Sequence, residues 1–482
     1  MQPTSLNFKE NAANALWDAQ LQNALKNVKT GFILKRAKAR DALPEFDALR
    51  AAAKDIKNHV LDYLDVYLEE YERRVIESGG HVHWARDASE AREIVVRLCR
   101  EAGARSVTKG KSMVSEEIAL NAALEEAGIE AVETDLGEYI IQLRHEAPSH
   151  IIAPAVHLNR GQIEEDFRRQ HTHLPADRHL SEASELVGEA RAVMRDKFLR
   201  ADVGITGANF LIAETGSSVI VTNEGNGDLT QLLPKTHIVV ASIEKIVPTL
   251  EDASTIMRVL ARSATGQEVT TYTTFSTGPR READPDGPAA YHVVLLDNGR
   301  TEMLGSEFHD MLRCIRCGAC LNHCPVYAAV GGHAYGWVYP GPMGAVLTPQ
   351  LIGIHDGAHL PHASSFCGRC EAVCPMDIPL PKMMRHWRER DYQAQGGVSF
   401  AKLALRGWVF VAKRPWLYRM AMGIGVRMLA TLGGRARRFR SLPMAGGWTK
   451  HRDLPAPAGR SFQSIWQAEL KSRRASQRAS HG

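Results

Sequence analysis

The sequence contains no apolar run long enough to cross a membrane. The best candidate, residues 417–432, spans about 16 residues and carries Arg419 and Arg427, whereas a membrane-spanning helix needs about 20 apolar residues. Aromatic residues make up only 7% of the chain, and the mean hydropathy is -0.24. Together with a hydrophobic share of 44%, these values exclude a polytopic membrane protein and a disordered chain. A length of 482 residues is too great for one hydrophobic core, so we expect two to four domains.

Cysteine is nearly absent outside one short region. Seven of the eight cysteines lie between positions 314 and 374, and the eighth, Cys99, lies on an apolar helix face. The first ten residues do not pair a charged head with an apolar run, as an export signal would. We therefore expect a cytoplasmic chain with reduced thiols, and the bunching of those thiols indicates a metal site.

Acidic residues are scarce in the last 85 positions. From Val398 onward, 17 Lys and Arg residues stand against only Asp453 and Glu469, although the formal charge of the whole chain is only +4. The overall balance indicates no nucleic-acid partner. We expect the apolar stretch of this basic tail to form an amphipathic helix packed on its own protein. Peripheral binding to an anionic membrane from the inside is the alternative.

The spacing of apolar residues divides the chain into four regions. Residues 1–79 show helical periodicity, with helices expected over 11–29 and 44–78. In residues 80–300, short β-type runs alternate with amphipathic helices, for example a strand at 81–85 followed by a helix at 88–101. This alternation predicts an α/β domain with a largely parallel sheet, which the later apolar runs at 219–221, 238–240 and 291–296 continue. The cysteine-rich region covers 301–395, and the basic tail covers 396–482.

The first cysteine group has the spacing of a bacterial ferredoxin. Cys314, Cys317, Cys320 and Cys324, followed by Pro325, form the pattern C-x2-C-x2-C-x3-C-P without deviation. In such a run, three thiolates hold one iron–sulfur cluster, and the fourth cysteine binds the other cluster. Backbone N–H groups in so tight a loop can also donate to cluster sulfur atoms.

The second group repeats this pattern with one change. Ser364 stands where the first cysteine is expected, and Cys367, Cys370 and Cys374 follow at the ferredoxin spacing. The crossover rule then assigns Cys314, Cys317, Cys320 and Cys374 to the first 4Fe-4S cluster, and Cys324, Cys367 and Cys370 to the second. Water, Ser364 or a residue of a partner chain could complete the second cluster, or it could hold only three iron atoms.

Zinc is the main alternative metal, because two C-x2-C pairs also suit a tetrahedral site of four sulfur atoms. Zinc would account for four cysteines rather than seven, and it gives no role to the two C-x3-C-P endings. The separation of 43 positions between Cys324 and Cys367 favours a helical ferredoxin module over a minimal one. A cluster of this type carries one electron at a time, so electron transfer is the expected role.

Two polar stretches of the α/β domain are candidates for ligand binding. Residues 207–218 and 223–227 are rich in Gly, Asn, Glu and Thr, and they flank a predicted strand. Loops at strand ends are where α/β sheets bind ligands, which makes Glu214 a candidate base or nucleophile. The alternative is that these glycines form turns and that Glu214 caps a helix.

With these residues in view, the chain resembles the iron–sulfur protein B family of the bacterial L-lactate utilisation system over nearly its whole length. Besides the cysteine groups, the resemblance rests on Lys111–Met113, Glu133–Glu138, Pro148–Ile151, Asp202–Phe210, Ala213–Gly216, Asn223–Gly225, Glu244–Lys245, Tyr339–Pro342 and Pro455–Phe462.

The resemblance implies a fold, a role and partners. The fold would be a lactate-utilisation domain like the CoA-transferase and sugar-phosphate-isomerase group, then a helical ferredoxin and a family-specific tail. The family also has a serine at the position of Ser364. The role would be electron transfer in a complex that oxidises L-lactate to pyruvate, together with a heterodisulfide-reductase-like cysteine-rich subunit and a second lactate-utilisation-domain protein. The alternatives are a subunit of a glycolate-type oxidoreductase, catalysis or ligand binding in the α/β domain itself, and purely structural clusters.

Overall fold

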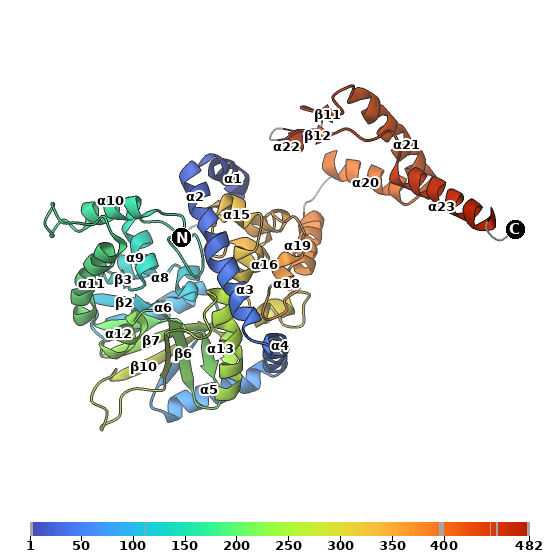
Figure 1. The fold of residues 1–482 in the computed structure, drawn as a ribbon. Helices are drawn as coiled ribbons and strands as arrows, with labels where there is room; N and C mark the ends of the chain where they lie inside the picture. Colours follow the sequence, from blue (N-terminus) through green and yellow to red (C-terminus); the bar gives the residue numbers. More distant parts are fainter. Residues whose placement is uncertain (1–2, 111, 395–399, 444, 450–451, 480–482) are drawn as a thin grey trace. The chain divides into compact units, whose positions relative to one another are not determined.

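The computed structural model describes residues 3–110, 112–394, 400–443, 445–449 and 452–479 (Figure 1). Lys111, which contributes to the family resemblance, lies outside the described residues. The chain divides into two compact units, 1–394 and 395–482, and each is described by itself.

Five α-helices open the first unit, as the helical periodicity predicted. They are α1 (Phe8–Trp17), α2 (Ala19–Val28), α3 (Leu34–Asp41), α4 (Phe46–Asp62) and α5 (Leu64–Glu77). The last of them ends before Gly79, whose φ of 90° lies in the left-handed region that only glycine adopts without strain. The apolar face of α4 and α5 packs against the main sheet through Val60, Leu64, Leu68, Tyr71 and Val75.

The main sheet has six strands, all parallel, in the order β1-β10-β7-β4-β2-β3. They are β1 (His81–Ala85), β2 (Ser106–Gly110), β3 (Glu130–Glu133), β4 (Val203–Thr206), β7 (Thr236–Ser242) and β10 (Ala290–Leu296). In β7, Ile238 and Val240 pack on one face of the sheet, whereas Val239 and Ala241 pack on the other. Helices cover both faces (Figure 1), so this strand reads as a continuous apolar run instead of an alternating one.

A second, smaller sheet has four strands in the order β8-β5-β6-β9. Its members are β5 (Phe210–Ile212), β6 (Ser217–Thr222), β8 (Ile246–Val247) and β9 (Tyr272–Ser276). The prediction that the run at 219–221 continues the parallel sheet was wrong, because β6 is antiparallel to both β5 and β9. The periodicity of a short apolar run shows that a strand is buried, but it does not show which sheet the strand joins.

The helices of the α/β region are α6 (Ala88–Glu101), α7 (Met113–Glu117), α8 (Leu120–Glu126), α9 (Leu136–Leu143), α10 (Arg160–Gln170), α11 (Ala183–Arg200), α12 (Asn226–Leu232) and α13 (Leu250–Ala264). Cys99 is buried in α6, as expected. α7 and α8 are separate helices because Ala119, between them, adopts a left-handed φ of 54° that interrupts helical hydrogen bonding.

The cysteine-rich region consists of short helices, consistent with a helical ferredoxin module. Its α-helices are α14 (Ala319–Asn322), α15 (Tyr327–Val330), α16 (Gly341–Ile352), α17 (Ile354–Gly357), α18 (Arg369–Ala372) and α19 (Leu380–Ala394). One hydrophobic core joins this region to α4, α13 and the smaller sheet. The cysteine loops are therefore packed directly against the α/β domain.

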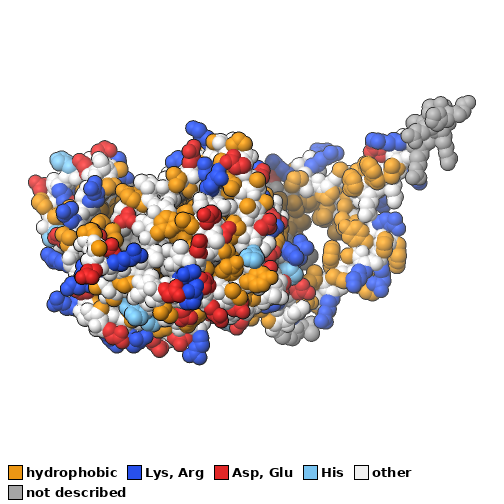
Figure 2. Space-filling model, turned by 90° about the horizontal axis from the view of Figure 1, so that it is seen from below, with side chains coloured by type: hydrophobic (Ala, Val, Ile, Leu, Met, Phe, Trp, Pro, Cys, Tyr) orange, Lys and Arg blue, Asp and Glu red, His pale blue; other side chains and the backbone are white. Residues whose placement is uncertain are grey.

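The second unit holds α20 (Phe400–Ala412), α21 (Pro415–Leu432), α22 (Gly446–Thr449), α23 (Phe462–Ala479) and the strand pair β11 (Arg438–Phe439) and β12 (Leu454–Pro455). Figure 2 shows basic and hydrophobic side chains intermingled on its surface. Among the described residues, no helix has the length and apolar character needed to cross a membrane. The expected amphipathic helix is α21, in which no residue is buried.

Candidate metal centre and the adjoining pocket

The two cysteine loops have the same backbone shape, fifty positions apart. Arg316 (φ 59°) and Phe366 (φ 54°) precede the second cysteine of the pattern in each loop, and Gly318 (φ 72°) and Gly368 (φ 76°) follow it. Each glycine then begins a four-residue helix, α14 or α18. The alternating left-handed residues curl each loop around its cysteines, so the sequence repeat is also a structural repeat.

The four cysteines assigned to the first cluster line one small pocket. Cys314, Cys317 and Cys320 come from the first loop, and Cys374 comes from the end of the second. The other lining residues are mostly apolar, among them Ile315, Met343 and Met376. Burial, followed by the charges of the neighbouring Cys374 and Cys314 thiolates, raises the pKa of Cys317 above its ordinary range.

The other three cysteines form a second group. Burial raises the pKa of Cys370 to about 12, and the nearby Cys324 and Cys367 thiolates add to this shift. Cys324 and Cys370 are buried, whereas Cys367 is exposed. Ser364, which stands where a fourth thiolate would be expected, accepts a hydrogen bond on Oγ from the Phe366 N–H at 3.2 Å.

Backbone N–H groups point at the sulfur atoms of both groups. The Ala319 N–H donates to Cys317, those of Val326 and Tyr327 donate to Cys324, and those of Met376 and Ile378 donate to Cys374. These bonds stabilise thiolate over thiol. Soft thiolate donors in two groups, surrounded by N–H donors and apolar walls, fit 4Fe-4S clusters.

A buried ionic network surrounds the first loop. The fully buried guanidinium of Arg300 pairs with Glu117 and with Glu244, at 2.8 Å in both cases. Arg316 pairs with the same Glu244 at 3.2 Å, and its guanidinium carbon lies 5.1 Å from the centre of the Tyr339 ring. Burial alone would raise the pKa of Glu244, but Arg300 and Arg316 lower it to about 2. The network connects the α/β domain to the cysteine loop.

Charged side chains anchor the second loop to the N-terminal helices. Arg50 of α4 donates from Nε to the Cys374 carbonyl at 2.7 Å and pairs with Asp377 at 2.7 Å. Lys54 pairs with the same carboxylate at 2.9 Å, and Arg36 of α3 donates to the Val373 carbonyl at 2.8 Å. These contacts place the N-terminal helices within the cluster-binding unit.

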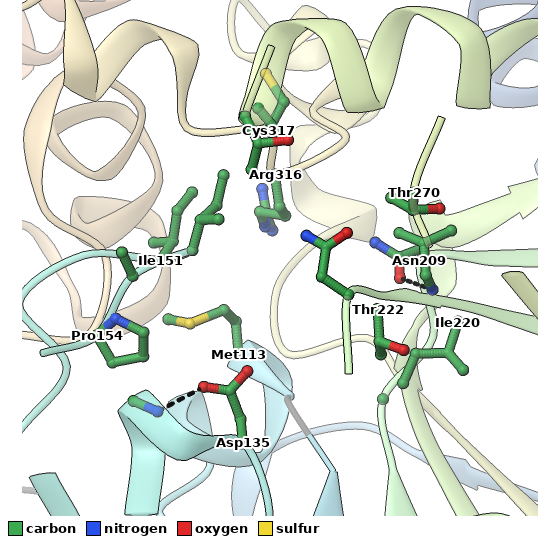
Figure 3. Close-up of a pocket in the computed structure, with 18 of the residues that line it drawn as sticks. Met113, Asp135, Ile151, Pro154, Asn209, Ile220, Thr222, Thr270, Arg316 and Cys317 are labelled. Atoms are coloured by element: carbon green, nitrogen blue, oxygen red, sulfur yellow. Dashed lines mark hydrogen bonds between the residues drawn. The ribbon is translucent and has the colours of Figure 1, made fainter. Parts of the chain in front are cut away.

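A cavity of about 540 Å³ adjoins the first loop. It lies at the carboxyl ends of the main strands, between segments that follow β3 (Asp135–Gly137) and β4 (Gly207–Asn209), and it is closed on another side by Arg316 and Cys317 (Figure 3). Parallel sheets bind ligands at this edge. The pocket therefore places a candidate ligand site directly beside a predicted cluster ligand.

The polar stretches that were predicted to bind a ligand divide between two locations. Residues 207–209, 222–224 and 226 line the pocket, as the ligand-binding interpretation expects. Glu214 is absent from the lining, and its Oε2 accepts the Leu250 N–H at 3.2 Å, at the start of α13. Glu214 therefore lies outside this pocket, and its exposed carboxylate caps the start of α13, as the alternative interpretation expects.

Sequence reasoning missed the cations of this pocket. In the sequence, Arg316 is a spacer within the cysteine pattern and Lys245 is only part of a family motif, yet both line the cavity. Burial lowers the pKa of Lys245 to about 8. A charged pair, Glu244–Lys245, directly after the apolar strand β7 was the available signal, because charged residues at such a position are costly unless they have a role.

Comparisons with known proteins agree with this architecture. Residues 68–296 match the LUD domain family model, residues 310–378 match a 4Fe-4S dicluster domain, and residues 370–471 match the C-terminal region of lactate utilisation protein B. Among curated proteins, Lactate utilization protein B of Shouchella clausii is 41% identical over 96% of this chain and 97% of its own length. The protein of the same name from Bacillus subtilis is 41% identical over 96% of both chains.

One solved structure, a DUF162 family protein from Deinococcus radiodurans, aligns with 48% of this chain and 98% of its own, at 15% identity and a TM-score of 0.27. That likeness is too low to support a conclusion. The near full-length relatives and the three family models are sufficient: this chain belongs to the lactate utilisation protein B family, with a LUD domain followed by a 4Fe-4S dicluster module.

Proposed function

We propose that this chain is the electron-transfer subunit of a complex that oxidises L-lactate to pyruvate. The observation that carries the proposal is the grouping of seven thiols into two sets within a dicluster module. The substrate is suggested by the name of the relatives. Oxidation of lactate releases two electrons and two protons, and 4Fe-4S clusters accept electrons one at a time.

In this proposal the first cluster is held by Cys314, Cys317, Cys320 and Cys374, and the second by Cys324, Cys367 and Cys370. The first group adjoins the pocket and the buried cations, so it suits the entry of electrons. The second group includes the exposed Cys367, so it suits their exit to a partner. Backbone N–H donors and the apolar surroundings stabilise the thiolate form and limit access of water.

The proposal is tested in the complex assembled with its partners under anaerobic conditions. L-Lactate should bleach the visible absorption of the clusters, and ferricyanide should restore it. A glycolate-type oxidoreductase, the second candidate, would instead be reduced faster by glycolate. A deletion strain that grows normally on L-lactate, in a host without a second copy of the gene, would contradict the assignment of lactate.

We also propose two partners, a cysteine-rich subunit of the heterodisulfide-reductase type and a second LUD-domain protein. The family resemblance suggests them, and the exposed second loop offers a contact for electron transfer. Affinity purification of the tagged full chain should recover both proteins in constant ratio. Recovery of the chain alone under anaerobic conditions would contradict this proposal.

For the basic unit we propose peripheral contact with an anionic membrane. Large apolar side chains are exposed beside the basic ones, including Trp408, Trp416, Ile424 and Trp466. An amphipathic surface of this kind binds membranes by apolar insertion together with attraction to anionic lipids. The chain should sediment with phosphatidylglycerol vesicles at low salt and should be released at high salt. Absence of binding at low salt would contradict the proposal.

A further inference from the structure

Around the pocket beside the first cysteine loop, buried cations outnumber buried carboxylates. Arg300, Arg316, Lys57 and Lys245 are all buried or nearly so, and the buried carboxylates among them are Glu117 and Glu244. The half-buried Asp135 and the exposed Glu224 also line the cavity. Lys57 is satisfied by the Glu244 and Ile246 carbonyls, and Arg300 by Glu117 and Glu244. The two cations that line the cavity, Arg316 and Lys245, are the ones left with spare donors.

Lys245 is the stronger indication of a ligand. Its side chain is only 7% exposed, and within the described part of the chain no hydrogen bond or ion pair engages its ammonium group. A buried ammonium without an acceptor is costly, so an anion in the cavity would relieve an existing penalty.

Arg316 has donors to spare as well. Its Nη2 reaches Glu244 at 3.2 Å, and across the described residues this is the single acceptor that its guanidinium finds. The Glu244 carboxylate is already shared with Arg300. A guanidinium presents five N–H donors in a plane that matches a carboxylate.

Asn209 adds a neutral donor across the cavity. Its Oδ1 accepts the Val221 N–H at 3.0 Å, which fixes the orientation of the amide, so that the NH2 group faces the pocket (Figure 3). Met113, Ile151, Pro154 and Ile220 form apolar walls nearby. Two cations, a neutral donor and an apolar wall together suit a small organic acid with a second polar group.

We propose that this pocket binds a 2-hydroxy acid, or the corresponding 2-oxo acid, through its carboxylate at Lys245 and Arg316, beside the predicted cluster ligand Cys317. The inference rests on the proposed function for its choice of acid, and it deepens that function by assigning the acid to this chain instead of to a partner. Lys245 and Arg316 act as binding residues, and Asn209 donates to the oxygen at carbon 2.

The test uses the full chain, reconstituted anaerobically, with oxamate and L-lactate as probes and neutral lactamide as the control ligand. Calorimetry should detect oxamate but not lactamide. Oxamate should also perturb the EPR signal of one of the reduced clusters, because the pocket and the first thiolate group share Cys317.

Three variants sharpen the test. Lys245→Met should weaken oxamate binding about tenfold or more, the value of one charged hydrogen bond, whereas Lys245→Arg should retain much of it. Asn209→Asp keeps an oxygen for the Val221 N–H but adds a negative charge, so it should weaken binding without changing iron content. Lys197→Met, on α11 and outside the pocket lining, should bind oxamate like the parent chain.

Unchanged oxamate affinity in Lys245→Met and Asn209→Asp, or absence of oxamate binding to the parent chain, would overturn the proposal. The proposal would also be overturned if Lys245→Met lowered the reduction potential of a cluster without weakening oxamate binding. The Lys245 charge would then only offset the charge of the cluster. If L-lactate reduces the clusters in the assembled complex while this chain binds no oxamate, the electron-transfer function stands and the pocket assignment fails. If oxamate binds but L-lactate reduces no cluster, the pocket assignment stands and the electron-transfer function fails.

Discussion

The two cysteine loops share a backbone shape but lie in opposite surroundings. The first loop is pressed against the α/β domain, where a Cβ on Gly318 would meet Ile152 at 3.0 Å, whereas a Cβ on Gly368 in the second loop would meet nothing within 4 Å. Buried or nearly buried arginines surround the first loop, and partly exposed ion pairs hold the second. One repeated sequence pattern thus forms an inner loop beside the pocket and an outer loop beside solvent.

The largest effect is expected from removing a thiolate of the first group, which comprises Cys314, Cys317, Cys320 and Cys374. Cys320→Ala should eliminate one of the two cluster EPR signals. The iron content should fall from about eight to about four atoms per chain, or from about seven to about three with a three-iron second cluster. Cys99→Ala is the matched control, because Cys99 is also buried but lies in α6, apart from both groups. Loss of iron in the control, or retention of both signals in Cys320→Ala, would refute the ligand assignment.

The next largest effect concerns the buried ionic network of the inner loop. Glu117→Ala removes one of the two buried carboxylate partners of Arg300 and leaves Glu244 to offset both Arg300 and Arg316. The free energy of unfolding should therefore fall by about 3–5 kcal/mol. Asp47→Ala, which breaks the exposed pair with Arg40, should cost less than about 1 kcal/mol. Urea denaturation followed by circular dichroism measures both, and equal costs would show that the network does not anchor the loop.

Ser364→Cys should make the outer loop more like the inner one. A fourth thiolate would favour a complete 4Fe-4S cluster, so any three-iron EPR signal of the oxidised protein should vanish, with a gain of about one iron atom per chain. Ser365→Cys, one position farther along, is the control. If a three-iron signal persists in Ser364→Cys, the residue does not occupy the fourth ligand position.

The smallest effect is expected at Asp377, the carboxylate through which Arg50 and Lys54 hold the second cysteine loop. Lys54 and then Arg50 lower the pKa of the Asp377 carboxyl, so its contribution to stability is fully present above the unfolded-state pKa near 4 and is lost as the pH falls through the lowered folded-state value. Because these pairs are partly exposed to solvent, Asp377→Asn should cost only about 1 kcal/mol at neutral pH. The cost should shrink with added salt and approach zero in acid, and a cost that grows on acidification would contradict this assignment.

The sequence predicted the bounds of individual strands and helices better than the way in which they assemble into sheets. The strand at 81–85 and the helix at 88–101 have the predicted bounds, because capping residues and periodicity are local signals. Asp87, for example, caps α6 by accepting the Ser89 and Glu90 N–H groups. The division of the strands between two sheets and the break at Ala119 depend on packing partners distant in sequence, which periodicity does not report.

The candidate site shows the same limit. The spacing of the thiols identified the cysteine-rich module without any structure, since three ligands come from one tight loop. The pocket instead collects Met113, Asp135, Pro154, Asn209, Lys245 and Arg316 from distant segments. Their convergence follows from the parallel sheet order and from the docking of the first cysteine loop, neither of which the sequence displays.

The most direct test of this account is a combined iron determination and redox-controlled EPR of the anaerobically reconstituted full chain. We expect about seven to eight iron atoms per chain and two distinct cluster signals that dithionite reduces and ferricyanide reoxidises. Fewer than about six iron atoms, or zinc as the bound metal with no redox-active signal, would contradict the claim that this chain gathers two electron-carrying clusters.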